Sequence, residues 1–283
     1  MSVRIGLAGI DSSHAEDFLR HFNAEGRHPG MRIAALWGDD PQRVAELLAR
    51  DGDIVAAPSL EALVRSVDAV IVGDRHGDLH LGHALPAIAA GLPVFVDKPL
   101  SNGLVDAGAM VTAAEAAGVP LCSGSALRWQ AETARLKARI AGLDGSFTLA
   151  TYGTWYPQNE YGGAIFYAIH SIELVQELLG IDSRKLAVAG GDVPVVTYQC
   201  GDAKVTIELR PLDASGSSAF GVRVRARAAE LEQPIVLGDD YMAPVAAKIA
   251  AMLRTGRSPL SRAELLAPVA LMEEIEARLT IRA

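Results

Sequence analysis

The stretch Gly91-Leu-Pro-Val-Phe-Val-Asp97-Lys98-Pro99-Leu100 decides the fold class of this chain. Its apolar run, 94–96, has the composition of a buried strand, and a carboxylate, an amine and a proline follow at once. In open sheets of parallel strands, ligands bind beyond the carboxyl ends of the strands. The stretch therefore predicts either a Lys98 that reaches a ligand or a solvated Asp-Lys turn, and alone it favours neither.

Strand-like and helix-like segments alternate around this stretch through residues 1–122. The expected strands are the short apolar runs 3–8, 31–37, 54–57, 68–72, 94–96 and 119–122. The expected helices are 15–24, a segment opened by Pro41, 60–66, 78–90 and 105–117. Strands that alternate with helices predict an α/β fold, a doubly wound parallel (Rossmann) sheet.

The pattern changes after residue 122. The expected helices are 131–141, 164–179, 241–255 and 262–279, and the expected strands are 146–156, 185–189, 193–200, 203–210, 219–228 and 230–237. Arg223, Arg225 and Arg227 alternate with apolar residues, which is the period of a strand with one wet face. Consecutive strands with short turns predict an α+β domain with a largely antiparallel open sheet. We expect a dinucleotide-binding domain, 1–122, and a domain for substrate binding and oligomerisation, 123–283.

The composition excludes several classes of partner. The net charge is −8 and no basic block occurs, so nucleic acid is not expected as a partner. Cys122 and Cys200 are far apart and form no metal-type pair, which fits a reducing compartment. No apolar run approaches the roughly 20 residues of a membrane span, and no signal-peptide layout precedes the first strand. We expect a cytoplasmic protein without a membrane partner.

The first strand-to-helix turn is an altered dinucleotide fingerprint. In the pattern Gly-x-Gly-x-x-Gly, Gly9 holds the first place, Asp11 the second and His14 the third. A carboxylate repels a pyrophosphate unless it caps the helix, and Asp11 is a good capping residue. The turn predicts either an anion site at a helix N-terminus or an ordinary capped turn. The candidate cofactor-binding residues here are Gly9, Ile10, Asp11, Ser12, Ser13 and His14.

The end of the second strand, Trp37-Gly38-Asp39-Asp40-Pro41, tests the choice of cofactor. An acid at this place binds the ribose hydroxyl of NAD, whereas an Arg would accommodate the phosphate of NADP. Gly38 and Asp39 therefore favour NAD, with NADP less expected. The alternative is that Asp39 or Asp40 only caps the following helix.

Three histidines, His76, His80 and His83, have spacings that would align on one helix for a metal. Gly77 and Asp78, however, mark the start of the helix and leave His76 in the loop. We expect no metal site.

Several motifs, in order along nearly the whole chain, resemble one family. They are Asp97-Lys98-Pro99 after a strand, His80 on the preceding helix, Arg128 after the sixth strand, and the segment Gly162-Gly163-Ala-Ile-Phe166-Tyr-Ala168-Ile-His170-Ser-Ile-Glu173. The link Leu253-Arg-Thr-Gly256-Arg-Ser-Pro259 between the closing helices also matches. The chain resembles the sugar and cyclitol dehydrogenases of the glucose-fructose oxidoreductase, inositol dehydrogenase and MocA family. It departs from them at Asp11 and His14, in the charged loop 73–78, and at Phe166 and Glu173, where the family has Asp.

The resemblance implies an NAD-dependent oxidoreductase acting on a hydroxyl of a sugar, cyclitol or related polyol. Oxidising an alcohol needs a base for its proton, and Lys98 and His170 are the candidate catalytic residues; His170 as a core histidine is the alternative. Asp74, His80, Asp97 and Lys98 complete the candidate cofactor site. The candidate substrate residues are Arg128, Trp155, Tyr156, Tyr161, Tyr167 and Glu173, the aromatics suiting either sugar rings or packing between domains. We also expect a homo-oligomer formed through the open sheet.

A second reading belongs to another functional class. On this fold, a protein without catalysis could sense a ligand or a dinucleotide and signal through a partner. Asp11 and Phe166, both at places where the family has other residues, keep this reading open.

Overall fold

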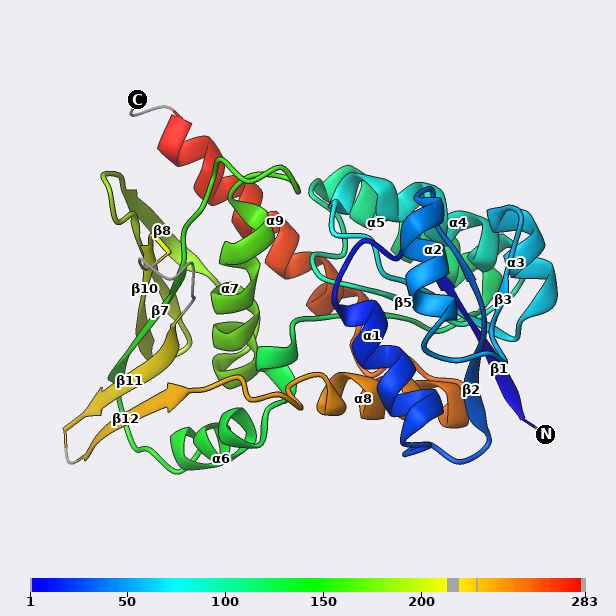
Figure 1. Cartoon of the computed structure of the whole chain (residues 1–283). Coiled ribbons are helices and arrows are strands. Elements are labelled where there is room, and N and C mark those ends of the chain that lie inside the picture. Colours follow the sequence, from blue (N-terminus) through cyan, green and yellow to red (C-terminus); the bar gives the residue numbers. More distant parts are fainter. Residues whose placement is uncertain (1, 213–218, 228, 281–283) are drawn as a thin grey trace. The chain divides into compact units, whose positions relative to one another are not determined.

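The computed structural model describes residues 2–212, 219–227 and 229–280 (Figure 1). The chain divides into two compact units. The first comprises residues 1–124 and 242–265, and the second comprises residues 125–241 and 266–283. The segment 242–265, which the sequence analysis placed in the second domain, clusters with the first unit. Whether the functional domains divide at residues 122 and 123 stays a prediction.

The first unit contains a six-stranded sheet in which every pair of neighbours is parallel. Its strands are β1 (Val3–Ala8), β2 (Met31–Trp37), β3 (Val55–Ala56), β4 (Ala69–Val72), β5 (Val94–Val96) and β6 (Leu121–Ser123). The order β3-β2-β1-β4-β5-β6 confirms the predicted doubly wound sheet. The strand order reverses between β1 and β4, which is where ligands bind in such folds.

Helices cover this sheet. They are α1 (His14–Leu19), α2 (Pro41–Leu48), α3 (Leu60–Ser66), α4 (His80–Ala89), α5 (Leu104–Ala117) and α8 (Ala243–Thr255). Local signals fix several ends: the Ser59 hydroxyl accepts a hydrogen bond from Ala62 N, and Gly118, at φ 66°, ends α5. Figure 1 shows α3, α4 and α5 side by side, while α8 contacts the segment that follows α1.

Two helices differ from the sequence prediction. The expected helix 15–24 is a six-residue α1 followed by the π-helix η1 (Arg20–Ala24). The expected helix 78–90 begins as the 3₁₀ turn η2 (Gly77–Leu79), and α4 starts only at His80. Periodicity cannot separate α, 3₁₀ and π turns, because their residues per turn differ too little over so few residues.

The second unit contains a mixed sheet of six strands. Its elements are η3 (Ala126–Trp129), α6 (Ala131–Ile140), β7 (Phe147–Thr154), α7 (Ile165–Leu179), β8 (Arg184–Ala189), β9 (Val195–Cys200), β10 (Ala203–Arg210), β11 (Phe220–Ala226) and β12 (Ala229–Ile235). The order is β12-β11-β7-β10-β9-β8, with β7 and β10 parallel and the other pairs antiparallel. The predicted largely antiparallel sheet is confirmed. The closing helix α9 (Arg262–Thr280) belongs to both units.

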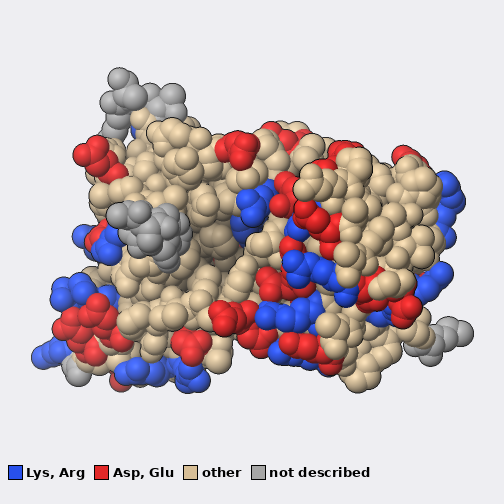
Figure 2. Space-filling view, viewed as in Figure 1, with Lys and Arg blue, Asp and Glu red and all other residues tan. Residues whose placement is uncertain are grey.

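The two faces of this sheet differ. One face packs on α7, and its side chains, such as Val222 and Val224, are buried. The other face carries exposed ion pairs between β11 and β12, Arg223 with Glu232 and Arg225 with Glu230, each at 2.8 Å. Figure 2 shows such acidic and basic side chains interleaved. The predicted alternation is confirmed for β11, although residue 227 lies in the turn after the strand.

Candidate functional site

Three loops of the first unit follow the carboxyl ends of β1, β4 and β5. The loops after β1 and β4 are in close contact at two glycines. Gly9 has φ 74°, and a Cβ there would lie 2.2 Å from the Asp74 carboxylate. A Cβ on Gly73 would lie 2.9 Å from Gly9 O. Because only glycine fits at these two positions, the Asp74 carboxylate rests directly on the turn that a dinucleotide fold uses for its pyrophosphate.

Asp11 does not cap α1, and that interpretation was wrong. Ser13 is the N-cap residue, without a side-chain capping bond, and the Ser12 hydroxyl accepts a hydrogen bond from His14 N at 3.2 Å. The Asp11 carboxylate instead accepts a hydrogen bond from Arg75 N at 3.0 Å. It therefore bridges the loops after β1 and β4. Burial and the charge of Asp74 raise the pKa of Asp11, despite the hydrogen bond from Arg75.

Asp11 and Asp74 form an acidic cluster with Asp39 and His83. His83 Nδ1 lies 2.8 Å from the Asp74 carboxylate. Burial alone would lower the pKa of His83, but the hydrogen bond and charge of Asp74, with the charges of Asp39 and Asp11, raise it. A protonated His83 offsets only part of the charge of the three carboxylates.

The acids after β2 divide between two roles. Asp40 caps α2, because its carboxylate accepts a hydrogen bond from Gln42 N at 2.9 Å. Asp39 is exposed. Because Asp39 does not cap the helix, its carboxylate is available for the predicted contact with an NAD ribose.

The loop after β5 begins with a buried contact between a carboxylate and a histidine ring. The Asp97 carboxylate lies 2.7 Å from His14 Nδ1 and is 3 % exposed. Burial would raise the pKa of Asp97, but the charge of His14 and its hydrogen bond, together with the charge of Lys98, lower it to about 2. His14, at the third glycine place of the fingerprint, therefore ties α1 to the end of β5. Lys98, the next residue along, is also buried.

We expect the Asp97→Asn substitution to lower the free energy of unfolding by about 2 kcal/mol, because the ionised carboxylate is stabilised in the folded state. The contribution is complete above the unfolded pKa of about 3.8 and is lost as the pH falls through about 2. Urea unfolding of both proteins, from neutral pH down to about pH 2, measures the difference. Asp53→Asn, at an exposed carboxylate, is the control. A deficit that did not shrink on acidification would contradict the charge-based explanation.

His80 lies in the core of the first unit. Its side chain is 0 % exposed. Nδ1 lies 2.9 Å from Pro99 O and 3.3 Å from Leu100 O, and Nε2 lies 2.9 Å from Asp74 O. The sequence analysis placed His80 among the cofactor-binding residues. In the structure, its ring contacts backbone carbonyls of two loops, and a role in cofactor binding stays a prediction.

His170 lies on α7 in the second unit and is half-buried. Its Nδ1 lies 2.6 Å from the Ser125 hydroxyl, and its ring packs edge-on against Phe220. Ser125 is fixed in turn: its N–H donates to the Glu173 carboxylate at 2.7 Å, and its hydroxyl accepts from Leu127 N at 3.2 Å. Sequence analysis missed Ser125, since it precedes His170 by 45 residues and belongs to no motif.

Arg128 and Glu173 were predicted to bind substrate. Both are buried, and Arg128 Nη1 lies 3.5 Å from the Glu173 carboxylate. Arg128 Nε lies 3.5 Å from the carboxylate of Glu177, which the sequence analysis did not select. These ion pairs join η3 to α7, so Arg128 and Glu173 both stabilise the second unit. Substrate binding by either residue stays a prediction.

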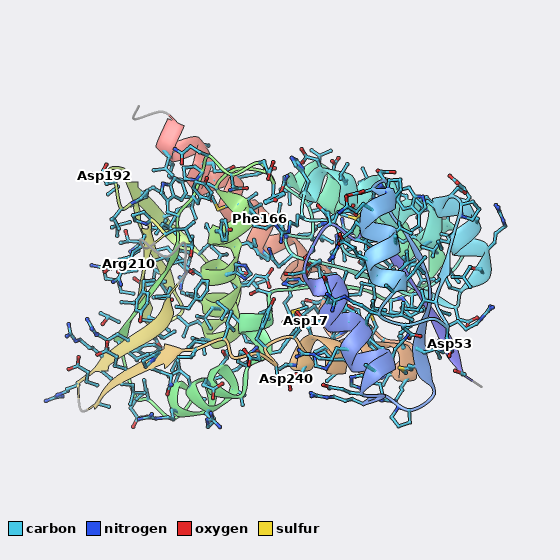
Figure 3. All side chains as sticks on the ribbon, in the orientation of Figure 1. Asp17, Asp53, Phe166, Asp192, Arg210 and Asp240 are labelled. Atoms are coloured by element: carbon cyan, nitrogen blue, oxygen red, sulfur yellow. The ribbon has the colours of Figure 1, made fainter. Side chains whose placement is uncertain are left out.

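The predicted aromatic residues gather at the start of α7. The ring of Phe166 contacts those of Tyr161 and Tyr167, with centroids 5.1 and 4.8 Å apart, and Tyr156 lies 6.2 Å from Tyr167. Figure 3 labels Phe166, which stands where the family has a carboxylate. Phe166 thus completes an aromatic cluster.

Trp155 and Tyr156 also line a cavity of about 710 Å³. It is bounded further by Pro157, Gln158, Gly191, Asp192, Pro211 and Leu212. Aromatic faces beside a carboxylate and an amide are suited to a sugar ring with its hydroxyls. Figure 3 labels Asp192, at the turn between β8 and β9.

In residues 2–212, 219–227 and 229–280, three or more His, Cys, Asp or Glu side chains are nowhere grouped so as to hold a metal ion. Among the helices of that same part of the chain, none has the length and apolarity needed to cross a membrane.

Comparison with known families gives a match to residues 3–125. The matching family is described as an oxidoreductase family with an NAD-binding Rossmann fold, and it includes the glucose-fructose oxidoreductases, inositol dehydrogenases and MocA. Residues 3–125, the N-terminal part of the chain, match this family. The match covers the first sheet and ends at Ser125, the residue that contacts His170.

Two curated relatives extend the likeness. Inositol 2-dehydrogenase of Acidiphilium cryptum is 34 % identical over 144 residues, which cover 50 % of this chain and 42 % of that protein. Inositol 2-dehydrogenase of Acidothermus cellulolyticus is 28 % identical over 264 residues, which cover 83 % and 75 %. The chain thus spans less than half of the first relative and three quarters of the second.

A solved structure matches the whole chain. Scyllo-inositol dehydrogenase from Lactobacillus casei, with bound NAD(H) and scyllo-inositol, aligns with a TM-score of 0.84 over 100 % of this chain and 98 % of that one. At 12 % identity the likeness shows the fold. The arrangement of both sheets in this chain is therefore that of a known fold.

Proposed function

We propose that this chain is an oxidoreductase that transfers a hydride between NAD and a hydroxyl-bearing or carbonyl carbon of a sugar, cyclitol or related polyol. The observation that carries the proposal is the position of Lys98, directly after β5, at the sheet edge where ligands bind in doubly wound folds. The family match and the inositol 2-dehydrogenase relatives support the substrate class.

Two features of the first unit are suited to binding a dinucleotide, and one opposes it. Gly9 opens the turn after β1 with a positive φ, and Asp39 stands exposed after β2, where an NAD ribose is bound in this fold. Asp11 and Asp74 place negative charge beside the same turn, which opposes a pyrophosphate. The fit therefore favours NAD over NADP and predicts an affinity reduced by the acidic cluster.

The mechanism assigns one role to each candidate catalytic residue. When bound, the nicotinamide accepts or returns the hydride. Lys98 polarises the reacting oxygen with its ammonium, and its stem is held in place by burial. His170 takes the hydroxyl proton as a general base. The aromatic rings of Trp155 and Tyr156 hold the sugar ring.

Ser125 determines which nitrogen of His170 accepts that proton. A neutral imidazole carries hydrogen on one nitrogen only. If Nδ1–H donates to the Ser125 hydroxyl, Nε2 is the basic nitrogen. Ser125 thus orients His170, and the Glu173 carboxylate holds Ser125 in place by accepting the hydrogen bond from Ser125 N.

The Ser125→Ala protein should show kcat reduced roughly tenfold or more, because the imidazole loses the partner that fixes its tautomer and orientation. The KM for the sugar should change much less. Steady-state kinetics across the pH range measure both, and Ser171→Ala, at a buried serine of α7, is the matched control. Equal losses of kcat in the two variants would contradict the orienting role.

Calorimetry with the purified chain tests the cofactor. We expect NAD and NADH to bind and NADPH to bind more weakly, because Asp39 opposes an added phosphate. Binding of NADPH alone would reverse the assignment. If none of the three binds, the result would favour the second candidate function, a non-catalytic sensor. The carboxylate of Asp11 and the apolar side chain of Phe166 support that candidate.

The proposal also includes cytoplasmic location and assembly of identical copies through the outer face of the second sheet. The exposed ladder of Arg223 and Arg225 with Glu232 and Glu230 supports this face, since its alternating charges complement a second copy rotated by half a turn. Sedimentation at low and high salt measures the assembly state. A monomer at all salt concentrations would contradict this part.

A further inference from the structure

Arg43 joins helix α2 to the turn after β1 with all three of its guanidinium nitrogens. Nε donates to Ile10 O at 2.8 Å, and Nη2 donates to Ser12 O at 3.2 Å. Nη1 and Nη2 also donate to the two oxygens of the Glu16 carboxylate, at 2.7 and 2.5 Å. One arginine of α2 thus holds two carbonyls of the turn and a carboxylate of α1, the helix that lies beside α2 (Figure 1).

The place of Arg43 is not explained by the stability of α2. Arg43 lies in the first turn of this helix, which begins at Pro41. A cation there opposes the helix dipole, because the N-terminus of a helix already carries partial positive charge. The carboxylate of Glu16 offsets the cation: burial would raise the pKa of Glu16, but the hydrogen bond from Arg43 lowers it. The planar fork of an arginine can hold a carboxylate and still direct N–H groups to the turn, whereas a lysine ammonium cannot.

The two carbonyls that Arg43 holds fix the direction of the peptide groups in the turn. Both peptides are trans, and in a trans peptide the carbonyl and the following N–H point in opposite directions. The N–H groups of Asp11 and Ser13 therefore point away from Arg43. The N–H of Asp11 agrees with this direction, because it bonds to the Asp11 carboxylate, which accepts from Arg75 N in the loop after β4.

We infer that Arg43 is a positioning residue for the cofactor, because it turns the N–H groups of Asp11 and Ser13 away from α2 to the side of β4. There the strand order reverses, and there a dinucleotide binds in this fold. Ile10 and Ser12, whose carbonyls are held, are buried, whereas Ser13 is exposed. A ligand can therefore reach the N–H side of the turn. The inference rests on the cofactor site of the proposed function, and Arg43 acts on that site through the backbone of the turn.

Nuclear magnetic resonance of the ¹⁵N-labelled full chain, titrated with inorganic pyrophosphate, tests the direction of the N–H groups without any turnover. The amide signals of Asp11 and Ser13 should shift in the parent as pyrophosphate is added. In the Arg43→Lys protein the same shifts should need roughly tenfold more pyrophosphate, the loss associated with one hydrogen bond to a charged group. A parent chain whose Asp11 and Ser13 signals do not move overturns the inference.

Two variants test the same role with the cofactor. Lysine keeps the positive charge but lacks the planar fork, so Arg43→Lys should bind NADH roughly tenfold more weakly. Its kcat at saturating NADH should be nearly unchanged, because Arg43 does not touch the reacting atoms. Glu16→Gln should show part of the same loss. The double variant should lose little more than Arg43→Lys alone, because the two residues act as one unit.

Arg50→Lys is the matched control, since Arg50 also lies 3.6 Å from the Glu16 carboxylate but is exposed. It should bind NADH as the parent does. Calorimetry measures the affinity of each protein for NADH, and urea unfolding measures its stability. Lower stability of Arg43→Lys at unchanged NADH affinity overturns the positioning role, because it would show a structural contact only.

The inference and the proposed function fail separately. If the chain oxidises no sugar or cyclitol, but pyrophosphate moves the Asp11 and Ser13 signals and Arg43→Lys weakens that response, the proposed function is wrong and the role of Arg43 stands. If the chain is active and NADH binds equally to the parent and to Arg43→Lys, the opposite holds. Should Arg43→Lys not fold, Glu16→Gln decides: a weakened pyrophosphate response supports the inference, and an unchanged one overturns it.

Discussion

The Lys98→Ala and His170→Ala proteins should turn over their substrate roughly 10²–10⁴-fold more slowly than the parent, the range associated with a general acid or base. Lys98 supplies the ammonium that polarises the reacting oxygen, and His170 supplies the base. Neither change removes a large apolar side chain, so the fold should survive. Turnover is measured by nicotinamide absorbance with a panel of sugars and cyclitols, and folding by circular dichroism.

Two matched variants separate chemistry from general damage. Lys137→Ala removes an exposed lysine that pairs with Glu177, and His28→Ala removes a half-exposed histidine of the first unit. Both should keep the parent's turnover. A His170→Ala protein with full turnover would show that the role given to His170 is wrong. A His170→Ala protein that unfolds would favour the core-histidine alternative, since Phe220 and Ser125 pack against the ring.

The Asp11→Asn substitution should raise the affinity for NADH roughly tenfold. The asparagine oxygen can still accept the hydrogen bond from Arg75 N, while the negative charge beside the turn is lost. At an effective dielectric constant of about 20, one charge contributes a few kcal/mol at contact distance, and salt screening reduces this to about 1.4 kcal/mol, or tenfold. Calorimetry of the parent and the variant with NADH measures the change.

The pH dependence gives a second readout of the same effect. Because the pKa of Asp11 is raised, lowering the pH neutralises it before most other carboxylates, and the affinity of the parent for NADH should rise. The variant should lack this part of the increase. Asp53→Asn, far along the chain and exposed, is the control. Weaker binding at unchanged stability would mean that Asp11 contacts the ligand. Binding detected only in the variant would favour the sensor.

The fold could be predicted because its signals are local. Alternating apolar runs and glycine stops gave the six parallel strands in their correct places, within about two residues. The capping role of Ser59 followed from the residue type alone. The alternation of Arg223 and Arg225 with apolar residues predicted the solvent-exposed face of β11. Each of these depends on neighbours within one turn of helix or one strand, which a sequence displays directly.

For the site, the sequence predicted which loops and helices contribute residues but not which side chains contact each other. Its decisive contacts join residues far apart along the chain: Asp11 with Arg75, Asp97 with His14, and Ser125 with His170. No local period links such pairs, and a residue type such as aspartate fits a cap as well as a bridge between loops. A helix cap was therefore one of the roles expected for Asp11, whereas its side chain bonds to Arg75 N in the loop after β4.

The return of the chain to its first unit has a consequence for synthesis. Helix α8 packs beside the segment after α1, and the Ser258 hydroxyl donates to Leu121 O at 2.6 Å, but both follow the whole sheet of the second unit in sequence. Chains leave the ribosome N-terminus first, and domains generally fold as units. The first unit is therefore incomplete when its six strands have been synthesised, because α8 follows only after about 240 residues. A fragment cut after β6 would lack the helix that packs beside η1.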